Sequence, residues 1–307
     1  MTRQTAHTLL LAFTALIWGM AFVAQSAGGA LGPFTFLACR SWVGLAVLLP
    51  TLGFFEAARR KAGRPAGLPQ TRAAKNALLA GGAACGTALC AASAAQQAAI
   101  TLDPSTAKAG FITAMYVVLV PVFGRLLGCR CGAQVWLCVL VSVAGLYLLC
   151  MKNGFGSIGP SDGLLLACAA LFSVQILLIN HFSPQVDGLW LSCMQFFVVA
   201  VQSTVCMFAL EQPSWEAIAA NAVPVLYCGV FSSGIAYTLQ IIGQKDLDPA
   251  VASIVMCLES VFGALGGWLV LGQTLTLREG AGCALIFGAV VLAQLPLRRL
   301  LRMRKTA

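Results

Sequence analysis

Charged residues are scarce in this sequence. Asp, Glu, Lys and Arg make up 9% of its 307 residues, whereas about 25% is usual for a soluble domain. Hydrophobic residues make up 59%, and the mean hydropathy is +0.88. The scarcity runs along the whole chain, so a soluble domain carried by one anchor is excluded. The composition predicts an all-α polytopic membrane protein.

Histidine occurs only twice, as His7 and His181, both near the ends of apolar segments. The sequence therefore has no HExxH zinc motif, and no membrane-embedded histidine that could activate the serines of "GVFSSG" (229–234). Paired aspartates within an apolar segment and a nucleotide-binding glycine loop are also absent. We predict that the protein is not an enzyme and has no catalytic residues, cofactor or metal.

Cysteine is abundant but has no metal-binding spacing. The thirteen cysteines lie mostly within apolar segments, where cysteine behaves as a small hydrophobic residue. The close pair Cys129 and Cys131 lacks neighbouring ligands. The net charge of +9 does not indicate nucleic-acid binding, because the basic residues gather in short loops and at the C-terminus without interleaved aromatics.

Apolar segments dominate the rest of the chain. About ten have the length of roughly 20 residues that a bilayer requires, at 8–27, 31–55, 76–97, 105–124, 132–151, 163–181, 188–209, 221–241, 250–272 and 278–297. The Gly-rich stretch "NGFGSIGPSDG" (153–163) separates two halves of similar size. The first segment is long enough to span and is not followed by a soluble domain, so we do not expect a cleaved signal peptide.

The distribution of basic residues predicts the topology. With the N-terminus in the cytoplasm, fifteen of the nineteen Lys and Arg residues fall on the inner face, and Arg40 lies within the second span. Both termini are therefore predicted to be cytoplasmic, in a bacterial-type inner (plasma) membrane. Five spans per half is an odd number, so the two halves run in opposite orientations. We predict one five-helix repeat at 1–153, an inverted repeat at 161–298 and a basic cytoplasmic tail at 299–307.

Two pairs of short matches suggest an internal repeat. "LDPSTAKAGF" (102–111) and "LDPAVASIVM" (247–256) open the fourth and ninth spans. "VPVFGRLLG" (120–128) and "ESVFGALGG" (259–267) follow in the same two spans, with a different offset that implies a short insertion. Inverted repeats around a midplane site are a recurring transporter design.

Ordered motifs along nearly the whole chain resemble the EamA-like part of the drug/metabolite transporter superfamily. They are "ALIWGMAF" (15–22), "PFTFLACR" (33–40), "AGFITAMYVVLVPVF" (109–123), "LVSVAGLYLL" (140–149) and the forty residues 237–276. The resemblance implies ten helices in two inverted five-helix repeats, a central cavity and, usually, export of small metabolites or drugs. The chain has Glu259-Ser260 where the family often has Glu-Pro, so we expect one helix kink to be missing. It also has Gly272-Gln273 where the family often has Gly-Glu.

Two charges lie deep within spans, each about 12 Å from one end at a rise of about 1.5 Å per residue. Glu259 shares its helix face with small residues, including the spacing Gly263–Gly267, so it should face protein or a cavity. It could carry a proton or pair with a cation, or it could form a structural hydrogen bond that fixes helix register. Arg40 could pair with a carboxylate, bind an anionic substrate or cap carbonyl groups.

Uncharged polar residues form stripes on several spans, and amides in hydrocarbon need hydrogen-bond partners. They indicate a modest aqueous cavity, with interhelical hydrogen bonding as the alternative for any single residue. The candidate cavity residues are Trp18, Gln97, Tyr116, Gln175, Gln195, Tyr237 and Gln240.

So few charges make a polyanionic substrate improbable. An amphiphilic or zwitterionic metabolite, such as an amino acid or a lipophilic drug, fits better. We predict a secondary active transporter, most often an exporter in this family, that works by alternating access. A flippase of lipids or lipid-linked intermediates is the first alternative, and a scaffold or sensor is another. The expected partners are a small-molecule substrate and the lipid bilayer, with no nucleic acid, and the sequence leaves the oligomeric state open between a monomer and a homodimer.

Overall fold

The computed structural model describes residues 3–27, 31–103, 106–129, 131–151, 159–245, 247–271 and 275–295. Within these ranges every regular element is a helix, and ten helical segments are long and apolar enough to cross a membrane. The predicted all-α polytopic class is therefore confirmed. The predicted tail at 299–307 and the pair Gly272-Gln273 lie outside the described residues.

Seven of the spans described are single helices. They are α1 (Arg3–Ala27), α2 (Pro33–Lys61), α3 (Arg72–Leu102), α6 (Ala133–Cys150), α7 (Pro160–Phe182), α8 (Gly188–Leu210) and α14 (Leu277–Gln294). The short helix α9 (Trp215–Ala220) precedes the eighth span.

The other three spans are interrupted. The fourth consists of α4 (Thr106–Thr113) and α5 (Tyr116–Leu126), and the ninth of α12 (Pro249–Met256) and α13 (Leu258–Leu271). The eighth contains α10 (Ala222–Tyr227), the π-helix η1 (Cys228–Ala236) and α11 (Tyr237–Gln244). π-Helical segments are rare overall, but those that occur often lie at functional sites. The region where these three spans meet is therefore a candidate site.

The ninth span corrects one expectation. The lack of proline after Glu259 predicted a missing kink, but the helix is interrupted at Cys257, two residues before Glu259. The backbone N–H of Cys257 donates to the carbonyl of Ser253, and the N–H of Ser260 donates to the carbonyl of Cys257 over only three residues. This tighter turn breaks the α-helical ladder without proline.

One antiparallel pair of helices, α2 and α8, is fastened at both ends. At the first end the Glu211 carboxylate accepts hydrogen bonds of 2.8 Å from the backbone N–H groups of Phe34 and Thr35. These are free donors in the first turn of α2, where the helix dipole also favours negative charge. At the other end Arg59 Nη2 lies 2.6 Å from Asp187 Oδ2.

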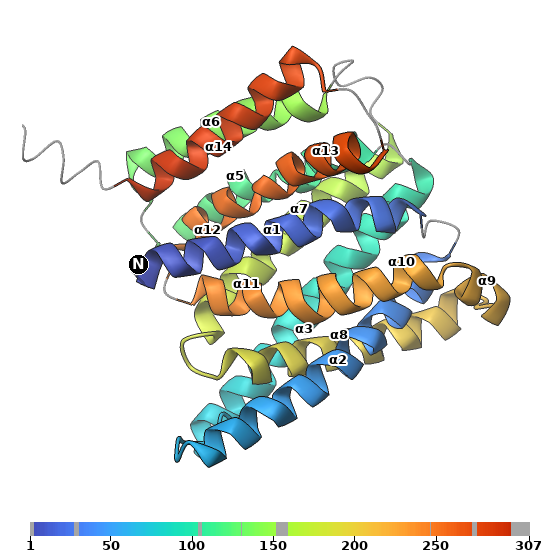
Figure 1. Ribbon diagram of the computed structural model, residues 1–307, viewed down its shortest axis with the longest axis vertical. Helices are drawn as coiled ribbons and strands as arrows, with labels where there is room; N and C mark the ends of the chain where they lie inside the picture. Colours follow the sequence, from blue (N-terminus) through green and yellow to red (C-terminus); the bar gives the residue numbers. More distant parts are fainter. Residues whose placement is uncertain are drawn as a thin grey trace, which may run out of the picture.

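A second antiparallel pair, α6 and α14, is fastened in the same way. Gln134 Nε2 at the start of α6 donates to the carbonyl oxygens of Leu292 and Leu295, each at 2.7 Å. At the far end Arg278 Nη2 donates to the carbonyl of Met151 at 2.9 Å. Figure 1 shows α6 and α14 at one edge of the bundle and α2 and α8 toward the opposite edge, with the interrupted eighth and ninth spans and α1 between them.

Close backbone contacts hold α1 against the ninth span. A Cβ added to Gly19 would lie 2.6 Å from the carbonyl oxygen of Glu259 and 2.6 Å from the backbone nitrogen of Gly263. Only glycine permits this approach, as is common where helices associate in membranes. The contact fixes α1, and with it Trp18, beside the start of α13.

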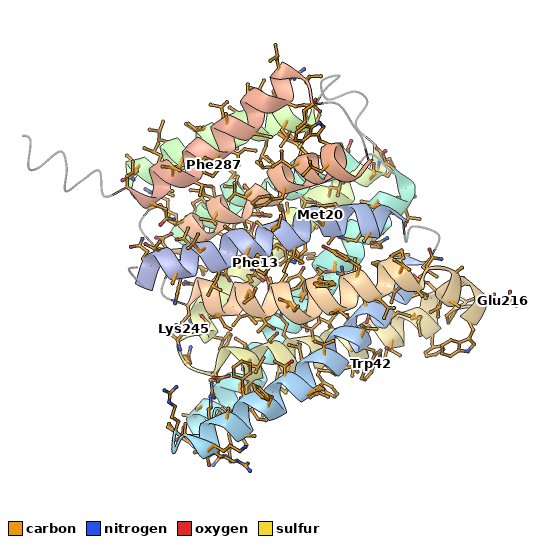
Figure 2. All side chains as sticks on the ribbon, viewed as in Figure 1. Phe13, Met20, Trp42, Glu216, Lys245 and Phe287 are labelled. Atoms are coloured by element: carbon orange, nitrogen blue, oxygen red, sulfur yellow. The ribbon has the colours of Figure 1, made fainter. Side chains whose placement is uncertain are left out.

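The outer surface is largely apolar. Phe13, Trp42 and Phe287 project outward and are between 45% and 60% exposed. Figure 2 shows Glu216 and Lys245 near opposite ends of the bundle. An apolar outer surface with charged groups at its ends suits a bundle embedded in lipid.

Candidate functional site

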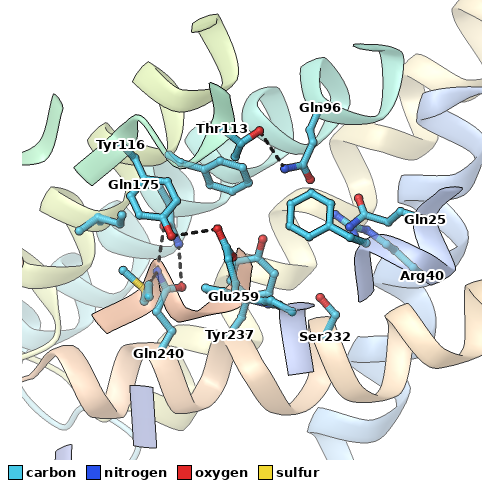
Figure 3. Close-up of a pocket in the computed structure, with 15 residues that line it drawn as sticks. Gln25, Arg40, Gln96, Thr113, Tyr116, Gln175, Ser232, Tyr237, Gln240 and Glu259 are labelled. Carbon is cyan, nitrogen blue, oxygen red and sulfur yellow. Dashed lines mark hydrogen bonds between the residues drawn. The ribbon is translucent and has the colours of Figure 1, made fainter. Parts of the chain in front are cut away.

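A pocket lies where the three interrupted spans meet α1, α2, α3 and α7 (Figure 3). It holds about 500 Å³ of empty space, part of it continuous with the outside. Its lining mixes aromatic, amide, hydroxyl and charged groups from Trp18, Phe22, Gln25, Arg40, Gln96, Thr113, Tyr116, Phe172, Gln175, Ile176, Ser232, Tyr237, Gln240, Met256 and Glu259.

Tyr116 and Glu259 meet in this pocket. Tyr116 is the first residue of α5 and Glu259 is the second residue of α13, so each follows directly on the interruption of its span. The Tyr116 hydroxyl donates a hydrogen bond to Glu259 Oε1 at 2.9 Å, and both side chains are buried. The first turn of a helix also favours a carboxylate, because its free N–H groups carry partial positive charge.

Buried amides form one end of the pocket. Gln175 Nε2 donates to Gln195 Oε1 at 3.3 Å and to Gln240 Oε1 at 3.5 Å, and Gln240 Nε2 in turn donates to Gln175 Oε1 at 3.4 Å. The three come from α7, α8 and α11, so they bind these helices together. The distances are long for amide hydrogen bonds, and amides held this loosely could exchange partners with a ligand.

Arg40 and two further amides form the opposite end (Figure 3). Arg40 is 4% exposed, and its guanidinium carbon lies 5.9 Å from the centre of the Phe36 ring. Gln96 Nε2 lies at 3.5 Å from Thr113 Oγ1, and Gln25 completes this side. Glu259 and Tyr237 lie between this end and the amide end.

Aromatic rings also line the pocket. The Trp18 and Tyr237 ring centres are 4.8 Å apart with an interplanar angle of 58°. Tyr237 also packs edge-on against Phe196, at 5.5 Å between centres. Trp18, Tyr237, Phe22 and Phe172 therefore add aromatic surface to a lining that is otherwise largely polar.

The structure brings together five of the seven candidate cavity residues and both intramembrane charges. Trp18, Tyr116, Gln175, Tyr237 and Gln240 line the pocket with Arg40 and Glu259. Gln195 stands behind the lining, bonded to Gln175. Gln97 does not line it either, and its Nε2 instead lies 3.4 Å from the carbonyl oxygen of Gln25.

Several lining residues were not among the candidates. Gln96 occupies the place expected for Gln97, since both continue the stripe through Ser93 at helical spacing, and sequence does not decide between them. Gln25 shares a helix face with Trp18, which was an available signal. Thr113 and Ser232 have no such signal, because the turn after Thr113 and the π-helix around Ser232 set their directions. In the described part of the chain, no three His, Cys, Asp or Glu residues are grouped as a metal site would require.

Comparison with known proteins shows what the chain is similar to. Residues 160–295 match the EamA-like transporter family. An uncharacterized transporter of Archaeoglobus fulgidus is 29% identical over 290 residues, which cover 93% of this chain and 84% of that protein. A WAT1-related protein of Arabidopsis thaliana is 29% identical over 121 residues, covering 38% of this chain and 31% of that protein.

A solved structure shares the whole fold. This crystal structure of a protein superposes with a TM-score of 0.76 at 25% identity, and the match covers 96% of this chain and 99% of the other. The predicted resemblance to the EamA-like family is therefore confirmed for residues 160–295, and the comparisons support a membrane transporter role for this multi-pass protein.

Proposed function

We propose that this protein is a secondary active transporter that exports a small amphiphilic metabolite, such as an amino acid or a drug-like compound, by alternating access. The observation that carries the proposal is the pocket at the junction of interrupted helices, with the Tyr116–Glu259 hydrogen bond at its centre. Substrate sites of secondary transporters are typically built by discontinuous helices near the midplane. Transport without catalysis is part of this proposal.

The packing pattern supports the predicted inverted repeats at 1–153 and 161–298. The helices α4 and α12 are each eight residues long, and each ends at an interruption of its span. Both fastened pairs take one helix from each half of the chain. Two halves related in this way could exchange their tilts around the pocket, which is the movement that alternating access requires.

The proposed location is the inner membrane, with both termini in the cytoplasm. Ten candidate spans among the described residues, an even number, support termini on one side, and the bias of Lys and Arg favours the cytoplasmic side. Fusion of a fluorescent protein or of alkaline phosphatase to the C-terminus tests this. We expect fluorescence from the first fusion and no phosphatase activity from the second; the reverse would overturn the orientation.

Transport itself is tested by counterflow in proteoliposomes that contain the purified protein. A panel of amino acids and lipophilic drugs is loaded inside, and uptake of labelled solute is followed with and without a pH gradient. We expect saturable counterflow for at least one amphiphilic solute. Absence of saturable flux for every solute, together with movement of labelled lipids between leaflets, would favour the flippase instead.

The two roles of Glu259 predict different results for Glu259→Gln. The glutamine keeps an oxygen that can accept from Tyr116, but it cannot release a proton. If Glu259 only holds α13 against α5, transport driven by a pH gradient continues at the wild-type rate. If Glu259 couples transport to protons, counterflow without a gradient continues while stimulation by the gradient is lost.

A further inference from the structure

Within the described part of the chain, the charge at the Arg40 end of the pocket has no counter-charge bonded to it. Arg40 is 4% exposed on α2 and lines the pocket. Among the residues that the structure describes, ion pairs are seen for Arg59 with Glu56 and Asp187, and none joins Arg40 to a carboxylate. Its Nε is buried without a hydrogen-bond partner.

The groups around Arg40 do not neutralise it. The ring of Phe36 and the thiol of Cys228 are its neighbours on the protein side, and both are neutral. Glu259, the carboxylate of the same pocket, is held by Tyr116 instead. A guanidinium remains charged in proteins, and burying a charge without a counter-ion is unfavourable. This cost is retained where the charge serves a ligand.

The remaining lining indicates what the ligand carries besides its anionic group. Of the described residues that line the pocket, Arg40 is the one cation, so the site suits a single negative charge. The rings of Trp18, Tyr237 and Phe172 also line the pocket. A carboxylate with an aromatic or branched aliphatic body would place its charge on the guanidinium fork and its body on these rings.

We propose that Arg40 binds the carboxylate of the transported molecule, which makes the substrate class an amphiphilic monocarboxylate. This inference rests on the proposed transport function, and it adds the chemistry that selects the substrate. Arg40 is then a specificity-determining residue rather than a structural one. A monocarboxylate could come from the aqueous phase or, as a fatty acid, from the bilayer, and both would use the same contact.

The test is direct binding to the purified full-length protein in detergent. Three acids, 3-phenylpropanoate, 4-methylpentanoate and decanoate, are titrated calorimetrically against their own uncharged amides. We expect at least one acid to bind wild type at least tenfold more tightly than its amide. A preference limited to decanoate assigns the site to a lipid-derived carboxylate, and a preference that includes 3-phenylpropanoate assigns it to a soluble one.

Variants of two arginines on the same helix separate charge recognition from folding. Arg40→Gln should remove the preference for the acid, and Arg40→Lys should weaken it several-fold because lysine lacks the planar fork. Arg59→Gln, at the far end of α2 and outside the pocket, should leave it unchanged. If Arg40→Gln does not fold, Arg40→Lys and the wild-type comparison decide.

The proposal is overturned if no acid in the panel binds more tightly than its amide, if the preference persists in Arg40→Gln, or if Arg40→Lys keeps it at the wild-type level. Its failure is distinguishable from failure of the proposed function. Saturable flux without any acid preference would overturn the role of Arg40 alone. Acid binding that depends on Arg40 in a protein without flux would overturn transport alone.

Discussion

The Tyr116 hydroxyl lies 2.9 Å from Glu259 Oε1 and connects two spans that are each interrupted just before the residue concerned. The two residues are 143 positions apart in the chain, one in each half. A buried hydrogen bond between two interrupted helices has consequences for both stability and movement. Removing this hydrogen bond should therefore change both properties.

Tyr116→Phe should lower the free energy of unfolding by about 1–2 kcal/mol. Hydrogen bonds between membrane helices average about 0.6 kcal/mol, and a buried acceptor left without its donor adds to the cost. Unfolding by SDS in mixed micelles measures the difference. Tyr227→Phe is the matched control, since its hydroxyl is half-buried and makes a longer bond of 3.3 Å to the carbonyl of Ile17. Equal losses in the two variants would contradict a special role for Tyr116.

Gly19→Ala should separate α1 from the ninth span. The added Cβ meets backbone atoms of Glu259 and Gly263 at 2.6 Å, and backbone cannot rotate away as a side chain can. We expect a loss of about 1–3 kcal/mol, the usual cost of overpacking, and reduced transport because Trp18 moves with α1.

Two other glycines provide the controls for Gly19. Gly263→Ala places its Cβ 3.4 Å from the Gly19 carbonyl oxygen, an ordinary contact, so its effect should be small. Gly53 has nothing within 4 Å of an added Cβ, and Gly53→Ala should be neutral. The thermal midpoint in detergent ranks the three variants. A wild-type midpoint for Gly19→Ala would mean that the helices are not so close.

Glu211→Ala should loosen the first end of the α2–α8 pair. It removes the acceptor for the N–H groups of Phe34 and Thr35 and for the Thr35 hydroxyl, so we expect a loss of about 2 kcal/mol. Glu211→Gln keeps one acceptor oxygen, so its free energy of unfolding should lie between those of wild type and Glu211→Ala. Glu216→Ala, an exposed position on α9, should change the SDS midpoint little, and a comparable drop there would argue for a general charge effect.

Asp187 combines two roles at the other end of this pair. It pairs with Arg59 and it caps α8 by accepting from the N–H groups of Leu189 and Trp190 at 3.0 and 3.3 Å. Asp187→Asn keeps the cap and loses only the ion pair, so it should lower the free energy of unfolding by less than about 1 kcal/mol, as expected for a partly exposed pair. Asp187→Ala loses the cap as well and should cost about 1 kcal/mol more. High salt should reduce the difference in unfolding free energy between wild type and Asp187→Asn, because salt screens the ion pair. The contribution of the cap should not change with salt.

The number of spans and the burial of Glu259 could be predicted from sequence, since both follow from the cost of exposing polar groups to hydrocarbon. The interruptions at 114–115 and at Cys257 could not, because no proline or glycine marks them and the surrounding packing decides where the ladder breaks. The types of side chain that line the pocket could be predicted more securely than the particular residues. Gln96 lines the pocket, whereas Gln97, the next residue in the same helix, does not.

The role of Glu211 shows a second limit. In sequence it is a charge between two apolar segments, and nothing nearby in the chain requires it. Its partners Phe34 and Thr35 are 177 and 176 residues away. Helix caps of this kind join distant segments, so local rules for capping do not find them.

Each fastened pair takes one helix from either half of the chain, so neither half can complete a pair alone. The first half by itself would leave α2 and α6 with unsatisfied ends and uncovered faces, and the second half would leave α8 and α14 in the same state. The halves are therefore obligate partners in assembly. A chain cut within the stretch 153–158 should yield two fragments that are each degraded when made singly and that reconstitute a single bundle when made together.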